Sequence, residues 1–285
     1  MDSLYETKLF LEINEWIEQN QKNKLNKIEQ TVKNSASYFF QKIPQEFTST
    51  LNEFISSSFF HTQSLLQTSK QFQEKKDDLL DRASIFNNKI NTIQDLKQLP
   101  LRQLNFLAEQ EISKAIVISS FQGGISGTSS KLALACDLPG LFLLNLKSVQ
   151  EIALCYGFDV SLPFEMECSL KVLQGALLPS PAKYNVWMNL MSNVVKLEED
   201  EIVFANWDDD ESFHNENFYQ PFLYHIGKLY VLFALKKRLI GGVPLIGIVA
   251  GAKWNETLTK NLLDYTKKFY QFRLLSNRIK KEPTD

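Results

Sequence analysis

The chain has 285 residues, a net charge of −2 and 22% charged residues. It is therefore long enough to bury a sizeable core, and its composition excludes a wholly disordered polyelectrolyte. The near-neutral charge gives no indication of nucleic-acid binding, so no nucleic-acid partner is expected. Glycine is scarce (11 residues) and phenylalanine abundant (21 residues), which argues against a turn-rich all-β protein. We expect an all-α protein with one compact multi-helix domain.

The N-terminal third lacks glycine, because all eleven glycines lie at or after residue 123. Apolar residues from Leu9 to Ile17 are spaced as on one face of a helix. Pro44 suits the first turn of a second helix, and a longer third helix is predicted from Phe59 to about Leu96. We expect residues 1–97 to form a helical extension packed on a core formed by residues 98–285.

The remainder of the chain is more apolar, and prolines and glycines divide it into further helices. The expected helices run from Pro100 to about Ser120, from Leu141 to Tyr156, from Pro163 to Leu177, and then, after Pro181, to about Lys196. Gly157 stands where a C-terminal cap is expected. The last helix carries an apolar stripe predicted to dock on the core, made of Leu258, Leu262, Tyr265, Phe269, Phe272 and Ile279.

Cysteine usage and hydropathy indicate the compartment. The three cysteines are widely spaced and form no C-x-x-C motif, which favours free thiols in a reducing cytosol. The most apolar window, Leu239 to Ala252, has fourteen residues, fewer than the roughly 20 that a spanning helix needs. We expect a cytoplasmic protein without a secretory signal, a metal site or a cofactor.

Small residues recur at a spacing of four in two apolar segments. The two pairs are Gly123 with Gly127 and Gly247 with Gly251. On helices this spacing lets two backbones approach closely, so the segments either pack against each other in the core or form a hairpin that enters a bilayer. The second interpretation draws on the cationic residues before the apolar window, Lys236, Lys237 and Arg238, which suit anionic lipid headgroups.

Several segments together resemble the EcsC family. They are Gly123-Gly124-Ile125-Ser126-Gly127, Asp137-Leu138-Pro139, Tyr156-Gly157-Phe158-Asp159, and Pro244 to Ala252 followed by Asn255 and Arg273. The family is named for a bacterial gene beside the two components of an ABC transporter, and its biochemical function is not established. The resemblance implies a largely helical, sometimes membrane-associated protein. The sequence departs from the family pattern after Trp207, where an acidic run replaces the arginine-containing stretch of relatives.

Polar residues inside these blocks are the candidate site. Asp137, Asp159 and Glu165 are the candidate acid or base residues; alternatively, Asp137 caps a helix beginning near Pro139 and Asp159 caps a helix or turns the chain. Arg273 is expected to pair with Asp159 or Asp137. Asn255 and Arg273 lie eighteen residues apart on one predicted helix and so face the same way. The candidate binding residues are Gly123, Gly127, Tyr156, Lys236, Lys237, Arg238, Gly247, Gly251, Asn255 and Arg273.

These features favour a non-enzymatic, peripheral membrane protein with an accessory or binding role near the membrane surface. Its expected partner is anionic membrane lipid or a membrane protein such as an ABC transporter. One alternative is a carboxylate-dependent hydrolase, which requires two of the candidate carboxylates in one pocket. The other is a soluble helical scaffold, which requires both glycine segments to be covered and no apolar patch to remain.

Overall fold

The structure is a computed structural model that describes residues 2–22, 53, 70–126, 131–178, 180–199 and 244–281. The described residues fold as an all-α protein, which confirms the predicted fold class. Its elements are α1 (Asp2–Lys22), α4 (Lys70–Ser84), the 3-10 helix η1 (Gln94–Gln98), α5 (Leu101–Ser126), α6 (Lys131–Cys155), α7 (Pro163–Leu177), α8 (Ser180–Glu199) and α11 (Pro244–Lys281).

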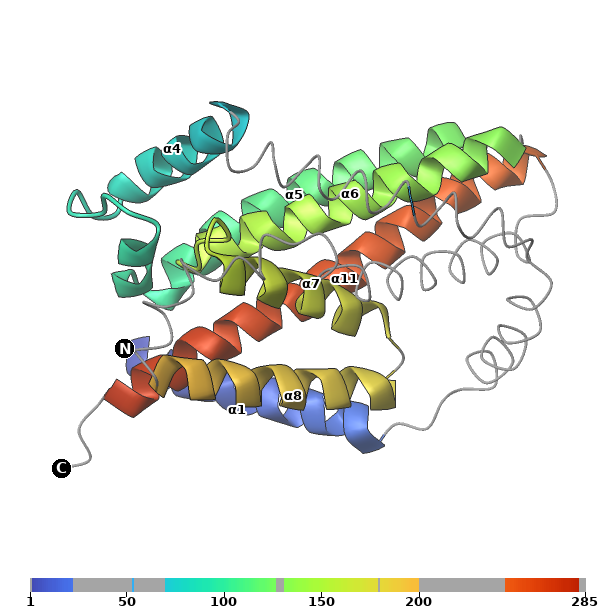
Figure 1. Cartoon of the computed structure of the whole chain (residues 1–285). Coiled ribbons are helices and arrows are strands. Elements are labelled where there is room, and N and C mark those ends of the chain that lie inside the picture. Colours follow the sequence, from blue (N-terminus) through green and yellow to red (C-terminus); the bar gives the residue numbers. More distant parts are fainter. Residues whose placement is uncertain are drawn as a thin grey trace.

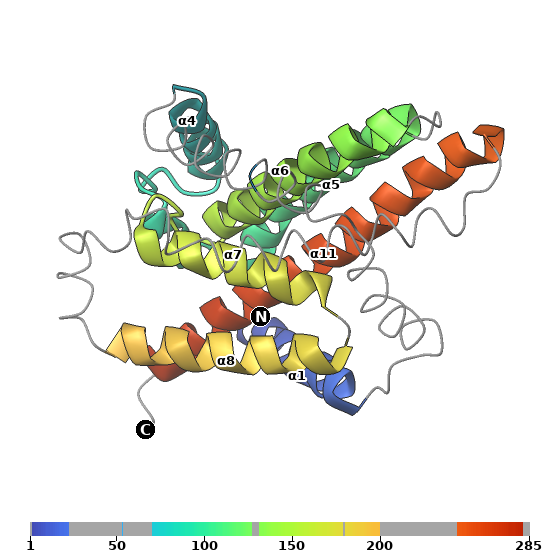
Figure 2. The same ribbon diagram turned by 45° about the vertical axis from the view of Figure 1, so that its right-hand side comes forward.

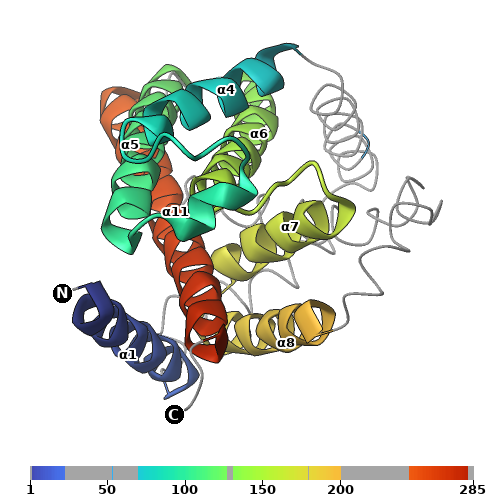
Figure 3. The same cartoon turned by 90° about the vertical axis from the view of Figure 1, so that its left-hand side faces the viewer.

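Helix α11 is the central helix of the described structure. It contacts α5 along much of its length and also packs against α6, α7 and α1. Around its C-terminal half lie α1, α7 and α8, while α5 and α6 accompany its N-terminal half away from that body (Figures 1 and 2). The end-on view shows α4 lying outside the bundle, over α5 and α6 (Figure 3).

The core follows from the apolar stripe of α11. Leu262, Tyr265 and Phe269 are fully buried, as predicted. Ile279 is 52% exposed, so including it in the buried stripe was wrong. The described parts of the N-terminal region, α1 and α4, contribute Ile13, Ile17, Leu79 and Ala83 to the same core; the boundary between residues 97 and 98 stays a prediction.

Local signals correctly placed the turn between α6 and α7. Gly157 has φ +82°, a left-handed conformation that glycine adopts without strain. The N–H groups of Gly157 and Phe158 donate to the carbonyls of Leu154 (2.9 Å) and Ala153 (3.0 Å), which is the Schellman pattern of a helix end. Helix α7 then begins at Pro163, where its missing N–H costs nothing.

Two helix ends beside the glycine and proline segments differ from the prediction. Helix α5 continues past Ser120 to Ser126, and α6 begins at Lys131, not at Leu141. Pro139 therefore lies inside α6, where it removes one backbone hydrogen bond. The extensive pairing of α6 with α5 outweighs that loss, because tertiary packing overrides local propensity. The same finding corrects Asp137, which lies within α6 and caps no helix start at Pro139.

The predicted helix from Phe59 to Leu96 was also wrong at its C-terminal end. Helix α4 ends at Ser84, and the carboxylate of Asp95 accepts hydrogen bonds from the backbone N–H groups of Asn91 (3.1 Å) and Thr92 (2.8 Å) before η1. These local side-chain hydrogen bonds hold the chain just before η1 in a turn instead of a continuous helix. The predicted second helix at Pro44 lies outside the described residues.

Candidate functional site

The outer parts of three helices project together from the body. We call residues 115–126 of α5, 131–146 of α6 and 244–252 of α11 the arm (Figures 1 and 2). The arm contains two charged residues, Lys131 and Asp137. Three large apolar side chains of α5 are exposed on it: Val117 (69%), Ile118 (53%) and Phe121 (72%). A contiguous group of exposed apolar side chains on an almost uncharged segment is typical of an interaction surface.

The sequence interpretation missed this exposed group because the expected helix ended at Ser120. The spacing of Val117, Ile118 and Phe121 matches one helical face, and continuing the helix through Phe121 would have revealed it. Nearby Gly123 is buried in α5.

Much of the predicted glycine and cationic site lies outside what the structure describes. Gly127 and the cationic residues Lys236, Lys237 and Arg238 fall outside the described residues, and Gly247 and Gly251 lie on α11 in a stretch whose surroundings are not described. Close packing of the glycine segments therefore stays a prediction.

Glu165 and Arg273 form a buried ion pair between α7 and α11. The guanidinium donates to both carboxylate oxygens, Nη1 to Oε2 (2.6 Å) and Nη2 to Oε1 (2.8 Å), and both residues are at most 4% exposed. The guanidinium also lies 4.0 Å from the centre of the Phe158 ring, where a cation is attracted by the ring face. This arrangement satisfies the charge of Glu165 internally, so the carboxylate acts as a structural group.

The predicted partners of Arg273 were wrong where the structure tests them. Asp159 lies at the α6–α7 turn and pairs with Lys76 of α4, with 2.7 Å between Oδ1 and Nζ. Its carboxylate also accepts the backbone N–H of Ser161 (3.0 Å), so Asp159 turns the chain in the manner of an Asx turn. Burial raises the pKa of Asp159, but the hydrogen bonds from Lys76 and Ser161 outweigh this and lower it overall. The side chain of Asp137 is outside the described set.

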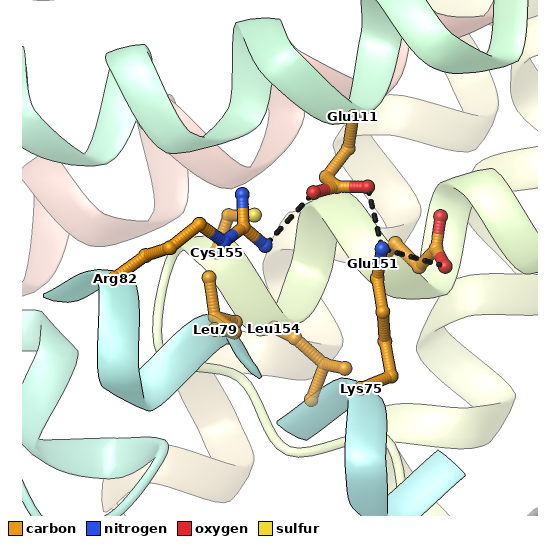
Figure 4. Close-up of a pocket in the computed structure, with 7 residues that line it drawn as sticks. All are labelled: Lys75, Leu79, Arg82, Glu111, Glu151, Leu154 and Cys155. Atoms are coloured by element: carbon orange, nitrogen blue, oxygen red, sulfur yellow. Dashed lines mark hydrogen bonds and ion pairs between the residues drawn. The ribbon is translucent and has the colours of Figure 1, made fainter. Parts of the chain in front are cut away.

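A second cluster of charges lies between α4 and the α5–α6 pair, and the sequence interpretation missed it. Glu111, 2% exposed, accepts hydrogen bonds from Lys75 Nζ (2.8 Å) and Arg82 Nη2 (2.9 Å). Lys75 also lies 3.5 Å from a carboxylate oxygen of Glu151, and Cys155 lines the same pocket (Figure 4). Its residues come from three separate segments, so no local spacing could have joined them.

The charges of this pocket are balanced by one another. Burial opposes ionisation of Glu111, but Lys75 and Lys114 outweigh it and lower the pKa. Burial raises the pKa of Glu151 despite Lys75 and Lys147 nearby, and it raises that of the Cys155 thiol well above its usual range. The lining side chains fill the pocket and leave no space for even a water molecule. The cluster therefore fastens α4 to the bundle.

Tyr156 takes part in buried hydrogen bonds between helices, and Asn255 is buried on α11. The Tyr156 hydroxyl donates to Asn105 Oδ1 (2.7 Å), and Gln271 Nε2 donates to the same oxygen (2.7 Å). These bonds join the end of α6 to α5 and α11. Asn255, 1% exposed, lies one turn before Thr259, whose hydroxyl donates to Asn145 Oδ1 (3.0 Å).

In the part of the chain that the structure describes, no three or more histidine, cysteine, aspartate or glutamate side chains are grouped to hold a metal ion. No helix in this described part is long and apolar enough to cross a membrane.

Comparisons with known proteins extend over nearly the whole chain. The model of the EcsC protein family matches residues 7–275. The chain is 24% identical over 275 residues to the uncharacterized protein YdbA of Bacillus subtilis (strain 168), covering 94% of this chain and 92% of YdbA. No solved structure matches. Because the family model spans far more than half of the sequence, this chain belongs to the EcsC protein family.

Proposed function

We propose that the protein is a non-enzymatic, peripheral membrane protein that contacts the bilayer surface through the arm. The observation that carries this proposal is the exposure of Val117, Ile118 and Phe121 on an arm with two charged residues. Water is a poor solvent for such a surface, and transfer of these side chains to the acyl boundary is favourable. Close packing of the glycine segments would stiffen the arm.

The cytoplasmic face is the proposed side of contact. Cys155 and Cys168 are free, buried thiols, and unpaired cysteines are typical of a reducing compartment. Burial raises the pKa of the Cys168 thiol to about 12, so this thiol stays protonated and unreactive.

The two alternatives have less support. A hydrolase would need two candidate carboxylates together in a pocket, whereas Glu165 is paired with Arg273 and Asp159 is paired separately with Lys76. A scaffold with a fully covered arm is disfavoured by the exposed side chains of α5. An accessory role at the membrane surface needs neither a catalytic pocket nor a cofactor.

Replacing Val117, Ile118 and Phe121 together with serine tests the proposal. Because full burial of each such side chain contributes about 1.5–3 kcal/mol, we expect partitioning onto vesicles to fall by at least about 100-fold. The measurement is flotation of the purified protein with liposomes. The matched control replaces three exposed apolar residues of the body, Leu4, Leu11 and Ile279, with serine and should float like the wild type. Equal flotation of both variants would contradict contact through the arm.

A further inference from the structure

We propose that three lysines at the base of the arm, Lys114, Lys147 and Lys253, bind the phosphate groups of anionic lipids when the arm enters one leaflet. This inference rests on the proposed contact of the arm with the membrane and adds the lipid class and the geometry. We call the three residues the lysine collar. Their side chains are 56%, 67% and 69% exposed, one on each helix of the arm.

Each collar lysine pairs with a glutamate on its own helix. The pairs are Lys114 with Glu111 (3.2 Å), Lys147 with Glu151 (4.0 Å) and Lys253 with Glu256 (3.0 Å). Helix α5 runs toward the tip of the arm, whereas α6 and α11 run away from it (Figure 1).

The order of lysine and glutamate along the chain reverses with the direction of the helix. Glu111 precedes Lys114 on α5, whereas Lys147 and Lys253 precede their glutamates on α6 and α11. The lysine therefore lies on the tip side of its glutamate in all three helices. Within each helix this polarity places the positive charge nearer to an approaching surface than the glutamate with which it pairs, which complements a layer of anionic headgroups.

Contacts between the helices place the collar lysines along the arm. Lys75 reaches both Glu111 and Glu151, so these two glutamates, and with them Lys114 and Lys147, lie at similar levels. The hydrogen bond of Thr259 to Asn145 aligns α11 with α6. Lys253 precedes Thr259 by six residues, and Lys147 follows Asn145 by two residues. Because both helices run away from the tip, Lys253 lies eight residues nearer the tip than Lys147, or about 12 Å at 1.5 Å per residue.

The length of arm beyond the collar lysine differs between the three helices. Helix α5 continues for twelve residues after Lys114, or about 18 Å, α6 begins sixteen residues before Lys147, or about 24 Å, and α11 begins nine residues before Lys253, or about 14 Å. The hydrocarbon core of a bilayer is about 30 Å thick, so one leaflet accounts for about 15 Å. Lysine stems cover apolar surface while their ammonium groups stay at headgroup level. The exposed group at Val117, Ile118 and Phe121 lies on the tip side of Lys114.

The test replaces all three collar lysines with glutamine, K114Q/K147Q/K253Q, and measures flotation with two kinds of vesicle. One is phosphatidylcholine alone, and the other is an equal mixture of phosphatidylcholine and phosphatidylglycerol. Glutamine keeps a hydrogen-bond donor for each glutamate, and circular dichroism checks that the variant folds. The matched control, K8Q/K22Q/K89Q, removes the same charge from exposed lysines outside the arm.

We expect the collar variant to partition about 100-fold less onto anionic vesicles, given the attraction of each lysine to an anionic surface. Its partitioning onto neutral vesicles should equal that of the wild type, and the control should change less than about twofold on both, because charges beyond a Debye length are screened. If the collar variant floats with anionic vesicles as well as the wild type does, the proposed role of the collar is wrong. The same conclusion follows if the control variant loses flotation to the same extent as the collar variant. Neither result would overturn contact through the arm. Failure of the wild type to float with either vesicle would overturn the proposed function itself.

Discussion

Replacement of Arg273 with methionine is expected to lower the free energy of unfolding by about 3–5 kcal/mol, because it leaves a buried carboxylate without its counter-charge. The guanidinium makes two hydrogen bonds to Glu165 and lies against the Phe158 ring. Methionine fills much of the volume of the arginine stem, so the loss reports mainly the missing charge. Urea denaturation followed by circular dichroism measures the effect.

A double replacement separates the charge from the packing. The variant Glu165→Leu/Arg273→Met removes both charges, and replacement of a buried ion pair by apolar residues of similar volume is often neutral. We expect the double variant to be several kcal/mol more stable than the sum of the single variants predicts, a coupling that double-mutant cycles detect. Additive effects would show that the two side chains do not act as a pair.

Replacement of Trp187 with alanine is expected to cost about 3–5 kcal/mol, the range for removal of a buried tryptophan. The indole of α8 is 1% exposed. It lies edge-on to rings of α1 and α11, with centroid distances of 5.8 Å to Trp16, 5.4 Å to Tyr265 and Phe269, and 5.7 Å to Phe272. The alanine variant opens a cavity where three helices meet, and thermal or urea unfolding reports it.

The adjacent residue provides the control for this effect. Met188 is 47% exposed, and surface substitutions usually change stability by within about 0.5 kcal/mol. Met188→Ala should therefore unfold like the wild type. A loss below about 1 kcal/mol for Trp187→Ala would show that the α1–α8–α11 junction contributes little to stability.

The sequence predicted those parts of the fold that depend on local chemistry. Gly157 and Pro163 marked the end of one helix and the start of the next, because a left-handed cap and a missing N–H act within a few residues. The stripe at Leu262, Tyr265 and Phe269 predicted the buried face of α11, because helical periodicity is itself a local property.

Features that depend on distant partners could not be predicted in this way. Arg273 pairs with Glu165, 108 residues away in sequence. The two predicted partners, Asp159 and Asp137, are also carboxylates in apolar segments, and the local sequence does not distinguish them from Glu165. Pro139 was predicted to start a helix because proline destabilises the interior of an isolated helix. The packing of α6 against α5, which allows the helix to continue through Pro139, is a tertiary interaction that the local sequence does not reveal. Each lysine of the collar resembles an ordinary surface charge. That all three lysines lie on the tip side of their glutamates becomes evident only when the directions of α5, α6 and α11 are known.

Hydrogen–deuterium exchange of the wild-type chain with and without anionic vesicles tests most directly whether the arm enters the membrane. We expect vesicles to slow exchange in residues 115–126 of α5 and in the N-terminal turns of α11, because bound lipid excludes water from these amides and suppresses local opening. Exchange in α1 and α8 should stay unchanged. Unaltered exchange in the arm while the protein is bound to vesicles, or protection confined to α1 and α8, would contradict entry of the arm into the membrane.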